Sequence, residues 1–129
     1  MTRDYTDFPG LSGLYLQDSY VVDIVEKKPG EFEFVLEAVL LREHPAYRSP
    51  VAGEQHCYAD GALIFTEVTA VDWLHRSSRR YKDATGTEDL GNIDSLTNSD
   101  GVYSVAGDWG KVLITSSVDP RFEFTDSRG

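Results

Sequence analysis

The residues best suited to metal chemistry lie between positions 44 and 60 of the 129-residue chain. They are His44, His56, Cys57 and Asp60, whose imidazole, thiolate and carboxylate groups are ligands that transition metals accept. Because His56 and Cys57 are adjacent, a strand would point them to opposite faces, and both could reach one ion only through a kink. A structural cysteine beside a surface histidine explains the pair better. The sequence therefore predicts no metal site and no cofactor.

Cys57 is the single cysteine of the chain, so it cannot form an internal disulfide. A catalytic thiolate would need a neighbouring imidazole, from His44 or His75, and no spacing in the sequence brings either histidine to it. Cys57 lies beside Tyr58 in a strand pattern, where a small apolar core residue is the simpler interpretation.

Paired carboxylates are the remaining catalytic candidates. Glu31 and Glu33 would lie on one strand face about 7 Å apart, a separation that also occurs between glycosidase carboxylates. A row of acids opposite an apolar face is usually a solvated face, and the chain is short for a glycosidase. There is also no glycine-rich phosphate loop, no Gly-x-Ser-x-Gly and no His-Glu-x-x-His. We therefore expect no enzymatic activity.

Candidate binding residues lie in the 43–56 loop and in one glycine-flanked turn. The loop interrupts the strand periodicity with prolines and a glycine, and loops of this length often carry function. Its candidate residues are His44, Tyr47, Glu54 and His56. Trp109, in the turn 107–110, is either a partly exposed anchor for a partner or an indole folded back over the open end of the core.

The charge of the chain restricts the class of its partners. Twenty-two acids against twelve bases give a formal charge of −10, which opposes binding to nucleic-acid phosphates and suits either solubility or a basic protein partner. Four of the bases lie in the run 76–82, which we interpret as a solvated loop pairing with acids. No apolar run approaches a membrane span, and the N-terminus lacks the pattern of a signal peptide. These features predict a cytoplasmic protein with no membrane contact.

Residues 31–42 are the segment around which the fold is expected to form. Apolar residues alternate from Phe32 to Leu40, with glutamates between them in the first half and apolar residues on both faces in the second. This period of two predicts a central strand with Phe34 in the core. The Pro29-Gly30 turn joins it to an earlier strand over 14–26, which makes a long hairpin.

The rest of the chain has turn signals about every ten residues. Further short strands are expected at 57–59, 63–65, 68–74, 90–96, 102–106, 111–116 and 121–124. Those between 57 and 74 should form a meander that turns at Asp60-Gly61. Residues 75–89 have little strand character and could hold a short helix. Residues 1–13 form a lead-in segment, poorly ordered unless Phe8 and Leu11 pack onto the domain.

With about eight strands, the chain is predicted to be a single all-β domain over residues 1–129. The arrangement is mostly antiparallel, either a β-sandwich or a partly open barrel. A domain of this length buries roughly two thirds of the surface of its unfolded chain. It therefore needs neither a disulfide nor a structural metal.

Three stretches together carry a resemblance to known proteins. They are Leu16-Gln17-Asp18-Ser19-Tyr20-Val21-Val22-Asp23, then His44-Pro45-Ala46-Tyr47 with Gly53-Glu54-Gln55-His56-Cys57-Tyr58, and Gly91-Asn92-Ile93-Asp94-Ser95 with Gly107-Asp108-Trp109-Gly110. Between about residues 14 and 118 the chain resembles small bacterial β-rich proteins of uncharacterised function, some of which look like immunity proteins of polymorphic toxin systems. The resemblance implies a non-enzymatic cytoplasmic domain and identifies no site residues. An acidic immunity protein would suit a basic toxin.

Three functions follow as expectations. The first is an acidic protein-binding domain, such as an immunity-type inhibitor, that occludes a basic partner. The second is a small-molecule-binding barrel, or an enzyme built on one, that uses the 43–56 loop. The third is a structural or oligomeric domain whose sheet edges pair with a second copy. A deep pocket lined by the loop would favour the second, and a filled core with a flat acidic face would favour the first.

Overall fold

The computed structural model describes residues 2–26, 28–50, 52, 56–77, 80–82 and 88–125. Two 3₁₀ turns, η1 (Tyr5–Asp7) and η2 (Pro9–Leu11), follow the first strand. The strands are β1 (Thr2–Asp4), β2 (Leu14–Val25), β3 (Phe32–Leu40), β4 (Cys57–Phe65), β5 (Val68–Arg76), β6 (Tyr81–Lys82), β7 (Glu88–Asp89), β8 (Ile93–Ser99), β9 (Val102–Gly107), β10 (Gly110–Ser116) and β11 (Arg121–Phe124).

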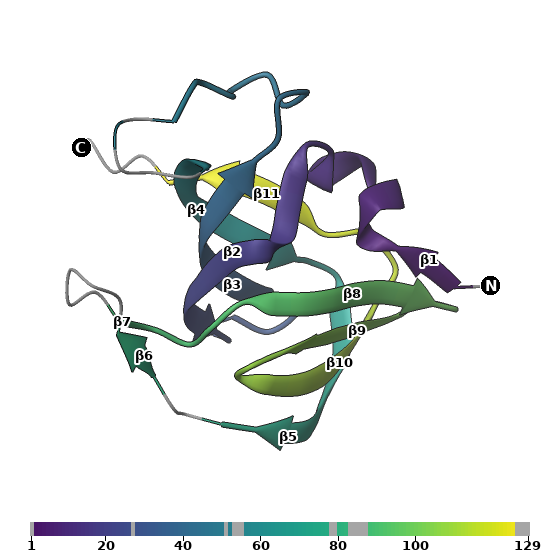
Figure 1. The fold of residues 1–129 in the computed structure, drawn as a ribbon. Helices are drawn as coiled ribbons and strands as arrows, with labels where there is room; N and C mark the ends of the chain where they lie inside the picture. The colour runs from purple at the N-terminus through teal and green to yellow at the C-terminus, as the bar shows by residue number, and fades with distance from the viewer. Residues whose placement is uncertain are drawn as a thin grey trace.

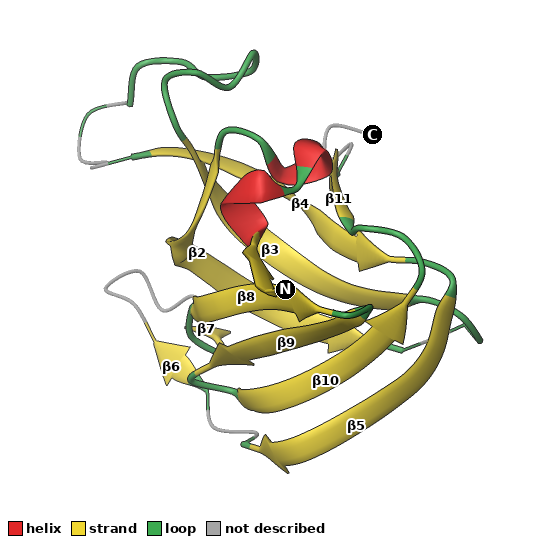
Figure 2. Ribbon diagram, turned by 90° about the vertical axis from the view of Figure 1, so that its right-hand side faces the viewer, coloured by secondary structure: helices red, strands yellow, loops and turns green. Residues whose placement is uncertain are grey.

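The strands form two antiparallel sheets that face each other. The five-stranded sheet has the order β1-β8-β9-β10-β5, the four-stranded sheet has the order β11-β4-β3-β2, and β6 pairs with β7 in a separate short ribbon. Figures 1 and 2 show the two sheets packed face to face, without closure into a barrel. The predicted all-β, antiparallel sandwich is therefore confirmed.

β3 occupies the inner position that its sequence predicts. It pairs with β2 on one side and β4 on the other, so its backbone donors and acceptors are used on both edges. Its alternate residues from Phe32 to Leu40 are buried and face the five-stranded sheet. The hairpin to β2 closes at Pro29-Gly30, where Gly30 has φ 81°, a conformation that glycine adopts without strain.

β2 departs from regular pairing between Tyr15 and Tyr20. Inside this bulge the Ser19 hydroxyl donates to the Tyr15 carbonyl at 2.7 Å and accepts from the Val39 amide at 2.9 Å. The buried serine thus replaces a backbone partner that the bulge removes from β3. On its other side β2 meets the segment before β8, since Val21 exchanges hydrogen bonds of 2.7 Å with Leu90 and Gly91. These two hydrogen bonds connect the two sheets along one edge of the sandwich.

Aromatic rings fill the space between the sheets. The Phe34 ring lies 5.1 Å from those of Phe32 and Trp109, and Phe65 lies 5.5 Å from Tyr103 on the opposite sheet. Such tilted and edge-on contacts add to the burial of apolar area. The core therefore rests on large rings contributed by both sheets.

The predicted meander over 57–74 is wrong. Residues 57–59 and 63–65 belong to one continuous strand, β4, and Gly61 lies within it opposite Leu36 rather than in a turn. A side chain at Gly61 would clash with the Phe122 ring and the Glu123 carbonyl of β11. Gly61 therefore leaves room for β11. The sequence does not indicate this role, because an Asp-Gly pair ordinarily predicts a turn. After Phe65 the chain crosses to the other sheet, where β5 pairs with β10.

Two segments with little predicted strand character, residues 1–13 and 75–89, contain strands in the structure. Phe8 and Leu11 are buried in the core, and β1 pairs with β8. In the region 75–89, β5 continues to Arg76 and the β6–β7 ribbon follows, so the helix considered there is absent from the described residues. Residues 78–79 and 83–87 lie outside them.

Within the part of the chain that the structure describes, no helix has the length and apolar character that crossing a bilayer requires.

Candidate functional site

The loop after β3 separates its candidate residues instead of gathering them. The His44 ring lies edge-on to Phe124 of β11 at 5.7 Å, and its Nδ1 accepts a hydrogen bond from the Ala46 amide at 3.0 Å. Tyr47 is half-buried against the core. His44 and Tyr47 thus serve to fold the loop back onto the sandwich.

His56 lies in different surroundings, next to β2. Its Nε2 is 3.1 Å from the Asp18 carboxylate, and its ring is edge-on to Tyr58 at 5.9 Å. The two loop histidines therefore contact different partners. Glu54, the fourth candidate of the loop, lies outside the described residues.

Trp109 corrects one expectation. Its side chain is fully buried between the sheets, and its Nε1 donates to the Asn92 carbonyl at 3.0 Å. The turn therefore folds the indole back over the core, and the partly exposed anchor for a partner is wrong. The sequence could not decide between the two positions because Phe34 and Trp73, which receive the indole, come from other strands.

Cys57 is buried on the inner face of β4, and its Sγ accepts a weak hydrogen bond from the Arg48 amide at 3.5 Å. No group of three or more His, Cys, Asp or Glu side chains is placed to hold a metal ion among the described residues.

The outer surface of the four-stranded sheet brings together three tyrosines that are distant in sequence. Since alternate residues of β3 point to the core, the others face outward. Register places Tyr15 and Tyr58 on either side of Val39, and Tyr20 on the neighbouring row opposite Glu37. We call this surface the tyrosine face.

The rings of the tyrosine face shield apolar surface while remaining accessible themselves. Tyr20 and Tyr58 are stacked at 6.4 Å between ring centroids. Tyr15 and Tyr20 are 37% and 39% exposed, whereas Val39, which lies between Tyr15 and Tyr58, is only 1% exposed. A valine on an outer sheet face is buried to this extent because its neighbours on both strands are large. The face therefore exposes aromatic rings over a covered apolar residue.

Carboxylates lie beside these rings and further along the same outer surface. The acids of the surface are Asp18, Asp23, Glu33, Glu37, Asp60 and Glu123. Two of these acids are paired within the surface, Glu123 with Arg121 at 2.6 Å and Asp18 with His56 at 3.1 Å. Acidic side chains thus line the tyrosine face. The sequence shows each tyrosine in a strand pattern, but only the register of β2, β3 and β4 makes them neighbours.

A second charged cluster fastens the N-terminal segment to the sandwich. The Arg3 guanidinium donates two hydrogen bonds to Asp119, at 2.7 and 3.2 Å, and lies 4.9 Å from the Phe8 ring centroid. The Tyr103 hydroxyl donates to the same carboxylate. The Arg3 guanidinium lowers the pKa of Asp119, and burial followed by this hydrogen bond raises the pKa of Tyr103 to about 12. Each group has its partners within the fold, which is typical of a structural cluster.

The pH dependence of unfolding should report this cluster. Because the pKa of Asp119 is lowered in the fold, its contribution is present above the ordinary value of 3.8 and is lost as pH falls through the lowered pKa. Asp119→Asn is therefore expected to destabilise the protein at neutral pH and to flatten the loss of stability below that value. Urea unfolding across the acid range measures both effects.

Asp94→Asn is the matched control, since Asp94 is an exposed acid on β8. Equal acid profiles for the two variants would contradict the assignment.

At the alkaline end, Tyr103 should contribute stability below its ordinary pKa of 10.0 that is lost as pH rises through about 12. Tyr103→Phe should remove that alkaline slope.

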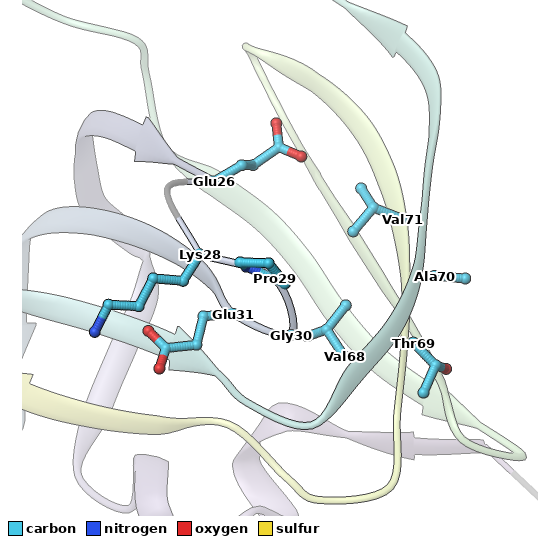
Figure 3. A pocket seen from close by; sticks show the side chains of 9 residues that line it. All are labelled: Glu26, Lys28, Pro29, Gly30, Glu31, Val68, Thr69, Ala70 and Val71. Carbon is cyan, nitrogen blue, oxygen red and sulfur yellow. The ribbon is translucent and has the colours of Figure 1, made fainter.

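A cavity of about 390 Å³ lies at the far end of the four-stranded sheet from the 43–56 loop. It is bounded by the β2–β3 turn, with Glu26, Pro29 and Gly30, and by the start of β5 (Figure 3). The turn and the loop flank opposite ends of β3, so the described part of the loop does not line this cavity. It is an open groove rather than an enclosed pocket.

Comparison of the chain with protein-family models, with curated proteins and with solved structures found no match.

Proposed function

We propose that the protein is a non-enzymatic, cytoplasmic binding domain that occludes a basic protein partner through its tyrosine face, in the manner of an immunity-type inhibitor. The observation that carries the proposal is the placing of Tyr15, Tyr20 and Tyr58 on one sheet surface among carboxylates. Tyrosine is enriched among residues that dominate binding energy, because it buries a large rigid surface and keeps a polar hydroxyl.

Charge supports a basic partner. The chain carries a formal charge of −10, and the tyrosine face contributes to it. Complementary charge accelerates the encounter of two proteins and disfavours partners of the same sign, including nucleic acids. The acidic outer surface of the four-stranded sheet, with its exposed tyrosines, favours this function over a ligand-binding barrel that uses the 43–56 loop.

The first experiment identifies the partner. The purified protein is immobilised and tested against the purified products of the neighbouring genes, at low and high salt. We expect a basic product to bind, with an association rate that falls as salt rises. If none of these products binds, the inhibitor proposal loses its support.

The second experiment locates the contact. Tyr20→Ala with Tyr58→Ala should weaken binding of that partner by about 30-fold or more, because interfacial tyrosines are often worth about 2 kcal/mol. Asp60→Lys should slow association, whereas Asp94→Lys, the same change on an exposed position of β8, should slow it less. Equal effects of the two lysine variants would place the contact elsewhere. Calorimetry and stopped-flow fluorescence measure affinity and rate.

A further inference from the structure

The outer edge of β5 is open. β5 is the last strand of the five-stranded sheet and pairs with β10 on one side, and no other described strand lies beside it (Figure 2). It is nine residues long and contains no proline or lysine, and its pairing with β10 shifts register at Thr69 and Leu74, so the strand is irregular at these two positions. Val71 and Leu74 on β5 are 37% and 50% exposed. Among the described residues, no strand pairs with this edge, so an extended segment could add to it.

One backbone hydrogen bond joins the start of β5 to the β2–β3 turn. The Val68 amide donates to the Gly30 carbonyl of the β2–β3 turn at 3.0 Å. Beyond this bond the turn and β5 diverge, and the cavity opens between them. An added segment would continue along β5 from that point.

The chemistry of the cavity fits a cationic side chain. Val68 and Val71 pair with the buried positions Ser116 and Ile114 of β10, so both valines lie on the inward face of β5. Figure 3 shows Val71 pointing towards the turn and the Glu26 carboxylate reaching over on the same side, while Lys28 and Glu31 point away from β5. Apolar walls with a carboxylate at one end suit the stem and head group of lysine or arginine.

Glu26 retains the capacity to accept such a head group. Among the described residues it forms an ion pair with Arg76, whose Nη1 lies 3.6 Å from the carboxylate, which is longer than a charge-assisted hydrogen bond. The Arg76 guanidinium also lies 4.3 Å from the Trp73 ring centroid, where a cation–π contact holds it. The carboxylate can therefore take a better partner while Arg76 stays over the indole.

We propose that the open edge of β5 binds an extended segment of the partner by strand addition, with a lysine or arginine side chain in the cavity against Glu26. The inference rests on the proposed function for the basic character of the partner. A second copy of this chain suits the edge less well, because two chains of charge −10 repel each other. Backbone hydrogen bonds would supply affinity, and the cavity would select the side chain.

The test uses the full chain labelled with ¹⁵N and a short peptide of alternating lysine and valine residues. We expect the peptide to shift the amide resonances of residues 68–72 and Gly30. A peptide with glutamate in place of lysine should not shift them. The lysine peptide methylated on alternate backbone nitrogens should also fail, because it cannot form the hydrogen bonds of a strand pair.

Two variants with matched controls test the cavity. Val71→Lys places a cation in the groove and should weaken peptide binding about tenfold, whereas Val118→Lys, at a position of similar exposure, should leave it unchanged. Glu26→Gln should weaken binding several-fold, whereas Glu43→Gln, in the loop at the other end of the sheet, should not. Both control residues are exposed.

The outcomes separate this inference from the proposed function. Shifts confined to Tyr20 and Tyr58 would overturn the β5 site and leave the tyrosine face in place. Unchanged binding after Val71→Lys, or no shifts at any peptide concentration, would also overturn it. A doubled mass in solution with the β5 edge protected before peptide is added would assign the edge to a second copy instead. Shifts of the β5 resonances that require the lysines of the peptide, Val71 and Glu26 would support the β5 site even if the tyrosine variants leave partner binding intact.

Discussion

Phe34→Ala is expected to lower the free energy of unfolding by about 3–5 kcal/mol. The Phe34 side chain is fully buried in β3, and its ring packs against Phe32 and Phe65 of its own sheet and against Trp109 in the β9–β10 turn of the other sheet. Removing it leaves a cavity that the surrounding strands cannot close, since each is held by pairing to its neighbours. Urea unfolding followed by tryptophan fluorescence measures the change.

Phe124→Ala is the matched control, because it makes the same truncation on β11, where the ring is 48% exposed. We expect it to change the free energy of unfolding by about 1 kcal/mol or less. A loss below about 1 kcal/mol for Phe34→Ala would mean that the two faces of β3 have been assigned the wrong way round.

Trp109→Ala should be comparably damaging, at about 3–5 kcal/mol. The indole lies between the sheets against Phe34 and Trp73, and its Nε1 is bonded to the Asn92 carbonyl. Truncation would remove the ring contacts and leave that carbonyl without its indole donor. Thermal and urea unfolding should both show the loss.

Trp109→Phe separates packing from the hydrogen bond. It keeps an aromatic ring and removes the donor, so we expect a smaller loss, of about 1–3 kcal/mol. If Trp109→Ala were as stable as the natural chain and instead lost partner binding, the indole would be a binding residue and its buried position would be refuted.

The proposed partner contacts lie on two different surfaces. The tyrosine face is the outer surface of the four-stranded sheet, whereas the open edge of β5 belongs to the five-stranded sheet. A partner with a basic surface and an extended basic segment could engage both, and the second contact would then gain from the first through effective concentration. The coupling is measured by comparing the partner affinity of a variant that combines Tyr20→Ala, Tyr58→Ala and Val71→Lys with the affinities of the tyrosine variant and the Val71 variant alone.

Local patterns were sufficient for much of the fold. The alternation in β3 predicted which of its residues form the core, and Pro29-Gly30 predicted the hairpin to β2. The same reasoning failed at Gly61, where an Asp-Gly pair lies inside β4 because the Phe122 ring needs the space. A turn and a close approach both favour glycine, and the sequence alone does not distinguish them.

The candidate surfaces required the tertiary structure. Period-two alternation determines which residues share a face of one strand, but pairing between distant strands determines which faces become neighbours. Tyr20 and Tyr58 meet only because β2 and β4 both pair with β3 in the observed register, and β5 has an open edge only because the chain crosses to the other sheet after Phe65. The sequence by itself determined an antiparallel all-β domain, its central strand and its negative charge. The tertiary structure decided that Trp109 belongs to the core, that the three tyrosines share one outer face and that β5 lies at the edge of its sheet, because these results depend on contacts between residues far apart in the chain.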